Sequence, residues 1–124
     1  ESGGSFPLGP GPGFSWWGAA YAEIVFTFLL CFVVLSVATT AAGLSQYFGL
    51  AIGACIVAGG FSIGAVSGGS LNPAVSLGVA AAHLPASGGG VLAFLLYTGA
   101  EITGAGLAAI AFKLTHPSEY PRMK

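Results

Sequence analysis

Charge is what this sequence has least of. Only 6% of its 124 residues are charged, and no Asp, Glu, Lys or Arg lies between Glu23 and Glu101. Three basic residues are too few to build a phosphate-binding surface, so binding to nucleic acid is excluded. The few charged groups also form no set of nucleophile, base and orienting residue, so we expect neither an enzyme nor a bound cofactor.

Cysteine is scarce as well. Cys31 and Cys55 are the two cysteines of the chain, and both fall inside apolar stretches. Cysteines in such surroundings act as small buried hydrophobic side chains. Their positions favour neither a disulfide nor a metal pair, so we expect no metal centre.

Apolar residues, in contrast, dominate the chain. They make up 55% of the residues, and the mean hydropathy is +0.88. A soluble domain of this size could not bury so much apolar surface, so the lipid bilayer must be its solvent. Three stretches are long enough to cross the bilayer, and they cover residues 19–42, 47–66 and 91–114. Residues 1–18 are rich in Gly and Pro and lack the pattern of a signal peptide, so we expect an extramembrane loop there.

All of the basic residues gather at one end of the chain. Lys113, Arg122 and Lys124 lie within or next to residues 115–124. The positive-inside rule places that segment on the cytoplasmic side of the membrane as a short tail. Three crossings then place residues 1–18 on the opposite side. The sequence therefore predicts a multi-pass membrane protein with a cytoplasmic C-terminus.

A helix start lies in the middle of this apolar sequence. In Ser67-Gly-Gly-Ser-Leu-Asn-Pro-Ala-Val-Ser-Leu-Gly78, Asn72 is a typical N-cap and Pro73 a typical first helical residue. A helix over residues 72–83 would rise about 18 Å, well short of a hydrocarbon core of about 30 Å. Non-helical backbone at membrane depth is tolerated only inside protein or beside an aqueous cavity. Residues 67–74 are therefore predicted to line a pore; the alternative is that Asn72 simply caps a buried helix.

These residues resemble the aquaporin, or major intrinsic protein, channels. The resemblance is carried by Ala22-Glu23-x-x-x-Thr27-Phe28, by Ser67-Gly-Gly-Ser-Leu-Asn-Pro-Ala74, and by Tyr97, Gly104 and Ala105. It implies an all-α membrane protein in which residues 19–114 form one aquaporin-like repeat of three transmembrane helices and one re-entrant half-helix carrying Asn-Pro-Ala. Family members contain two such repeats related by an inverted pseudo-twofold axis. This repeat looks more like the C-terminal one, although Val75 and Glu101 resemble the first.

The resemblance also implies a function, a passive channel for water. In that role Asn72 would orient passing water, and Pro73 and Ala74 would shape the junction with the half-helix of a second repeat. Glu23 would hold the backbone N–H groups of the loop before Asn72. Glu101 could do likewise, sit near a mouth of the pore, or serve only helix packing. A homotetramer in the lipid bilayer, with one pore per subunit, is expected. The alternative is a non-conducting structural subunit of a larger membrane complex.

The narrow filter of the family would fall on Gly60, Gly69 and Val75. Water-selective members usually carry His at the first of these positions and Arg at the last, and both are missing here. The opening should therefore be wider and less polar unless a second repeat supplies large residues. This departure favours glycerol or other small neutral solutes as further permeants.

Overall fold

The computed structural model describes residues 7–41, 43, 46–87 and 90–119, and this part of the chain is all helical. Helix α1 spans Trp16–Val34 and continues into a π-helical turn, η1, at Leu35–Thr39. Helices α2, α3 and α4 span Phe48–Ser67, Pro73–Ser87 and Gly90–Thr115, and a short 3-10 turn, η2, follows at Pro117–Glu119. The predicted all-α fold class is confirmed.

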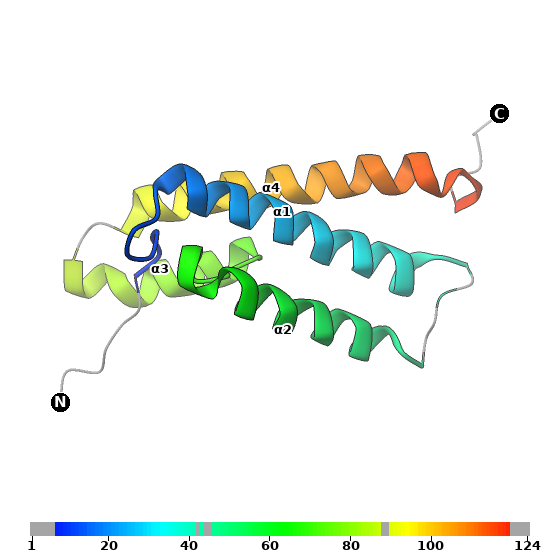
Figure 1. Ribbon diagram of the computed structural model, residues 1–124, viewed down its shortest axis with the longest axis horizontal. Coiled ribbons are helices and arrows are strands. Elements are labelled where there is room, and N and C mark those ends of the chain that lie inside the picture. The colour runs from blue at the N-terminus through cyan, green and yellow to red at the C-terminus, as the bar shows by residue number, and fades with distance from the viewer. Residues whose placement is uncertain (1–6, 42, 44–45, 88–89, 120–124) are drawn as a thin grey trace.

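Three of the helices are long and apolar enough to cross a bilayer. They cover Trp16–Thr39, Phe48–Ser67 and Gly90–Thr115, whereas the apolar part of α3 is limited to Pro73–His83. Helix α1 contacts both α2 and α4, and α3 packs on α4. Figure 1 shows that α3 begins near the middle of the long axis of the molecule and runs back to one end. The arrangement agrees with the expected repeat of three spans and one half-helix.

The helix bounds differ from the sequence prediction by three residues or more in two places. The first span begins and ends three residues earlier than residues 19–42, because Ser15 caps α1 by accepting a hydrogen bond from Gly18 N at 3.1 Å. Helix α3 continues to Ser87, past the predicted end at residue 83. Residues 1–6 of the N-terminal loop and residues 120–124 of the tail, with Arg122 and Lys124, lie outside the described residues.

The core is a seam of small and polar side chains between α1 and α4. Helix α1 buries one residue per turn, namely Ala19, Glu23 and Thr27. Helix α4 faces them with a buried stripe that includes Ala93, Tyr97, Ala100, Glu101, Gly104, Ala108 and Phe112. Small residues at such a seam let helix backbones approach closely, which is how helices associate in lipid. Many large apolar residues, such as Phe61 and Leu92, are left on the outside, where lipid would cover them.

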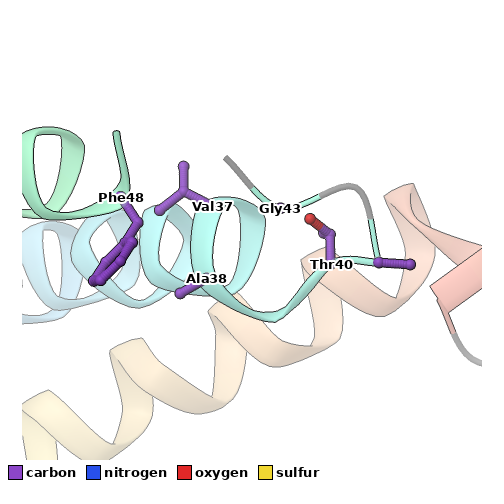
Figure 2. A pocket seen from close by; sticks show the side chains of 6 residues that line it. Val37, Ala38, Thr40, Gly43 and Phe48 are labelled. Atoms are coloured by element: carbon purple, nitrogen blue, oxygen red, sulfur yellow. The ribbon is translucent and has the colours of Figure 1, made fainter. Parts of the chain in front are cut away.

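Two hydrogen bonds between segments far apart in the sequence connect the elements at the two ends of the bundle. Gly11 N donates a hydrogen bond to Val66 O at 2.9 Å, which fixes the N-terminal loop on the last turn of α2. At the other end, Ala41 N donates to Glu119 Oε2 at 3.0 Å and joins the end of the first span to η2. Beside this second contact lies an open pocket of about 290 Å³, lined by Val37, Ala38, Thr40, Ala41, Gly43 and Phe48 (Figure 2).

Candidate functional site

The site is built on the sharp reversal between α2 and α3. Gly68 and Gly69 have φ values of 88° and 66°, in the left-handed region where a side chain would be strained. Leu71 is also left-handed, with φ 57°, although it is not glycine. Its side chain is only 5% exposed, so burial holds an otherwise unfavourable backbone conformation in place. The reversal brings the start of α3 back into the middle of the bundle (Figure 1).

Glu23 holds this reversal from α1. Its side chain is fully buried, and Oε1 accepts hydrogen bonds from Ser67 Oγ at 2.7 Å and from Ser70 N at 3.0 Å. Oε2 accepts from Leu71 N at 2.8 Å. Both carboxylate oxygens are therefore engaged, and the N–H groups of the reversal are satisfied without water. The position of Glu23 is that of a support for the loop that leads to Asn72.

Glu101 supports the next step of the chain from α4. It is fully buried, and its Oε1 accepts from Asn72 N at 3.2 Å and from Ser76 Oγ at 2.8 Å. Its Oε2 is also buried but has no hydrogen-bond partner among the described residues. The sequence left three roles open for Glu101, and its hydrogen bonds agree with the first, a support of the half-helix start.

Asn72 stands at the N-terminus of α3 with its side chain exposed. Its Oδ1 accepts a hydrogen bond from Ala74 N at 2.9 Å, so the side chain caps the helix. With the oxygen engaged, the amide NH₂ remains available as a donor at the open side of the helix start. Pro73 begins α3, where its missing N–H leaves no bond unmade. Ala74 follows on the exposed side.

The three predicted filter positions lie close to one another. A Cβ placed on Gly69 would lie 3.4 Å from the Cα of Gly60, so these two glycines bring the reversal and α2 into contact. Gly69 and Val75 line one pocket of about 120 Å³ together with Ser67, Gly68, Ser70, Val79, Pro7 and Leu8. The side chain of Val75 is 47% exposed. We refer to this as the filter pocket.

A second, larger pocket lies on another side of the α3 start. Its volume is about 510 Å³, and its walls come from α1, from the start of α3 and from α4. The lining residues are Thr27, Leu30, Cys31, Val34, Leu35, Leu71, Asn72, Pro73, Glu101, Ile102, Ala105 and Ala109. None of them lines the filter pocket. We refer to this as the α1–α4 pocket.

The hydrogen-bond partners of several polar residues of the site are not evident from the sequence. Tyr97 donates from its hydroxyl to Ser67 O at 2.6 Å, and Ser70 and Ser76 share a hydrogen bond of 2.7 Å between their hydroxyls. Tyr97 lies four residues before Glu101, which places both on one face of α4. This four-residue spacing was the one sequence signal that could have placed Tyr97 at the site beside Glu101. No sequence signal indicated the hydrogen-bond partners of the serines, because those partners lie on other elements.

Comparison with known proteins agrees with this geometry. The family described as Major intrinsic protein matches residues 3–112 of the chain. The chain belongs to this family. It is 40% identical to aquaporin NIP2-1 of Oryza sativa subsp. japonica over 61% of its own length and 24% of that protein. It is 32% identical to aquaporin AqpM of Methanothermobacter marburgensis over 90% of its own length and 46% of that protein.

The major intrinsic protein chain described here is thus shorter than its relatives. It spans about half the length of the archaeal relative, and about a quarter of the rice relative lies within the matched region. Since that family consists of membrane channels, the apolar helices are those of an integral membrane protein.

Proposed function

We propose that this chain forms one half of a channel that conducts water and small neutral solutes across a membrane. The observation that carries the proposal is the start of α3, which lies within the span of the bundle with Asn72 exposed at its tip. The buried carboxylate of Glu23 holds the loop before Asn72, and the buried carboxylate of Glu101 accepts from Asn72 N itself. A rigid, protein-supported helix start at membrane depth is expected beside an aqueous path.

The chemistry of this tip favours neutral permeants. The N-terminus of a helix carries a partial positive charge of roughly one half, which repels cations and hydronium from the centre of a pore. The Asn72 NH₂ would donate a hydrogen bond to a passing water oxygen, because its Oδ1 is already engaged by Ala74 N. A water held in this orientation cannot relay a proton along a single file.

The filter positions favour a wide opening. Gly60 and Gly69 contribute no side chain, and Val75 contributes an apolar one. In this proposal glycerol or a similar small neutral solute passes together with water. Residues that narrow the opening, if any, come from a second repeat.

Three further features belong to the same proposal. A second aquaporin-like repeat completes the pore, in line with the archaeal relative of about twice the matched length. The assembled protein is a homotetramer with one pore per subunit. The C-terminal tail lies in the cytoplasm, because all three basic residues lie at that end.

Asn72→Asp tests the proposal directly. Aspartate keeps an oxygen for Ala74 N but loses the NH₂ donor and adds a negative charge at the pore centre, so we expect osmotic water flux to fall about tenfold or more. The measurement is light scattering of vesicles that contain the protein after an osmotic step. Gln46→Glu is the matched control, because it makes the same change of amide to acid in the exposed turn between α1 and α2.

The control should leave the flux unchanged. Equal flux in the Asn72→Asp variant and the unchanged protein would contradict the proposal. No flux in the unchanged protein, together with a fixed stoichiometry with unrelated membrane chains, would favour the alternative of a non-conducting structural subunit.

A further inference from the structure

A continuous series of side-chain hydrogen bonds passes beside Asn72 and connects two pockets of the structure. Ser70 lines the filter pocket, and its hydroxyl shares a hydrogen bond of 2.7 Å with the hydroxyl of Ser76. Ser76 Oγ donates to Glu101 Oε1 at 2.8 Å, and Glu101 lines the α1–α4 pocket. Asn72 lines that pocket as well, so both ends of the series lie next to the proposed solute path.

The two hydroxyls in this series can both accept and donate a proton. A serine hydroxyl has one donor hydrogen and two acceptor lone pairs. In the bond between Ser70 and Ser76, either oxygen can be the donor. The Ser70 hydroxyl also has a second acceptor, Asn72 O at 3.3 Å, so it can turn between two hydrogen bonds. The series therefore has the groups and the rotational freedom that proton hopping requires.

Glu101 supplies the ionisable group at the end of the series. Its side chain is fully buried, and its Oε2 has no hydrogen-bond partner among the described residues, so one oxygen is not used to hold the fold. Ionisable residues within membrane spans commonly belong to ion pathways or proton relays. The negative charge of Glu101 also offsets the partial positive charge at the start of α3, which would otherwise repel a proton.

The other buried carboxylate, Glu23, does not continue such a series. Its Oε1 accepts from Ser67 Oγ and Ser70 N, and its Oε2 accepts from Leu71 N. A backbone N–H group holds a carboxylate oxygen but does not give up its proton. Glu23 is also not among the residues that line the α1–α4 pocket. A proton on Glu23 would therefore have no onward route, whereas Glu101 connects to a second pocket.

We propose that Ser70, Ser76 and Glu101 form a proton relay that carries protons past Asn72 without using the file of water. A hydronium ion in the filter pocket gives a proton to Ser70 Oγ, while Ser70 passes its own proton to Ser76 Oγ and Ser76 passes its own to Glu101 Oε1. Each hydroxyl breaks one O–H bond and forms another, and the carboxylate becomes a neutral carboxylic acid. This inference rests on the proposed function, in which both pockets hold permeating water.

Release of the proton completes the transfer. Rotation of the carboxyl group of Glu101 brings the protonated oxygen to the position of Oε2, where water in the α1–α4 pocket takes the proton and becomes hydronium. The carboxylate is then restored. The hydroxyls of Ser70 and Ser76 turn back to their starting hydrogen bonds, so the net result is one proton moved from one pocket to the other.

Glu101→Gln tests the relay with little change of shape. Proton flux is measured after a small pH step in vesicles that contain the full-length protein and a pH-sensitive dye, with K⁺ and valinomycin to balance the charge. The Gln oxygen still accepts from Ser76 Oγ and Asn72 N but cannot take up a proton, and its NH₂ group replaces an oxygen that no described donor contacts. We expect proton flux above that of protein-free vesicles to fall about tenfold or more.

Two serine variants test the same relay at its other links. Ser70→Ala and Ser76→Ala each remove one hydroxyl, and each should lower proton flux as far as Glu101→Gln does. Because the links act in series, the double serine variant should lower it no further. Ser36→Ala is the matched control, because it removes a part-buried hydroxyl that donates to Phe32 O and lines neither pocket. Its proton flux should equal that of the unchanged protein.

The remaining outcomes overturn the relay. Proton flux in the unchanged protein that does not exceed that of protein-free vesicles would do so, as would full proton flux in Glu101→Gln or losses that multiply in the double serine variant. Parallel loss of water flux and proton flux in all three single variants would mean that protons share the solute path. Osmotic water flux of the same vesicles is a separate readout. Proton flux without water flux would contradict the proposed function alone, and water flux without proton flux would contradict the relay alone.

Discussion

The two buried glutamates differ in how completely each is satisfied. Both side chains are fully buried, yet Glu23 accepts three hydrogen bonds that use both oxygens. Within the described part of the chain, the two bonds to Glu101 use only one of its oxygens. An ionised carboxylate is tolerated in a low-dielectric interior when donors surround it. Glu23 meets this condition within the repeat itself. Its role is therefore to hold the reversal between α2 and α3.

Glu23→Gln should destabilise the protein by about 2 kcal/mol. The NH₂ group of Gln would replace one carboxylate oxygen and face an N–H or hydroxyl donor, so that donor would be buried without a hydrogen-bond acceptor. Thermal unfolding in detergent measures the effect. Glu119→Gln makes the same change at a more exposed carboxylate that accepts one hydrogen bond from Ala41 N, so its effect should stay below about 1 kcal/mol. Equal effects for the two variants would argue against a special role for Glu23.

Val75 offers a test of the predicted filter. Val75→Arg adds bulk and charge to a partly exposed side chain in the filter pocket, so we expect glycerol flux to fall more than water flux. The ratio of the two permeabilities in vesicles is the measurement. Val75→Leu is the control, because it adds bulk without charge and should change the ratio less. If neither variant alters the ratio, Val75 does not face the solute.

At the scale of elements, α1 and α4 owe their close contact to the absence of a side chain at Gly104. A Cβ at this position would meet the carbonyl oxygen of Ile24 and would lie 3.0 Å from Phe28 N. Both of these are backbone atoms of α1, which cannot move aside without moving the helix. The close approach of α1 and α4, the helices that carry Glu23 and Glu101, therefore depends on the absence of a side chain at Gly104.

Gly104→Ala should separate α1 from α4 and destabilise the protein by about 1–3 kcal/mol, the usual cost of overpacking a well-packed core. Gly99→Ala on the same helix is the control, because a Cβ there would have nothing within 4 Å. Alanine is the better helix former, so this control should be neutral or stabilising by up to about 1 kcal/mol. The measurement is the thermal unfolding of both variants in the same detergent. If Gly99→Ala is as unstable as Gly104→Ala, the explanation is contradicted.

At the scale of the whole molecule, the half-span of α3 leaves the bundle asymmetric. Helix α3 fills one half of the long axis beside α4, and the α1–α4 pocket lies at its start (Figure 1). An inverted second repeat would add a matching short helix from the other side of the membrane. The proposed channel is complete only with both halves.

The intact mass of the protein from its native membrane tests this directly. We expect a polypeptide at or above twice 12.2 kDa, with both repeats on one chain as its approximately doubled archaeal relative would suggest. Mass spectrometry of the complex released from detergent is the measurement. A complex built only from 12.2 kDa chains would contradict a distinct second repeat.

Much of the architecture could be predicted from local sequence. The long apolar runs predict membrane spans because a bilayer core needs about 20 apolar residues per helix. Asn72 and Pro73 predict the start of a short helix because capping depends on neighbouring residues alone. The start of α1 was predicted three residues late, because the capping role of Ser15 is hard to recognise among Gly, Pro and Trp residues.

What the sequence determined by itself is the class of the molecule: an all-helical membrane repeat with an interrupted span and almost no charge, since hydropathy and capping act over a few neighbouring residues. Only the tertiary structure decided which oxygens of Glu23 and Glu101 are engaged, that Gly60 lies against Gly69, and that a pocket opens between α1, α3 and α4. These features join residues that lie far apart in the chain, such as Glu23 and Leu71, which are 48 positions apart. Such contacts depend on how closely the helices approach, which no local pattern encodes.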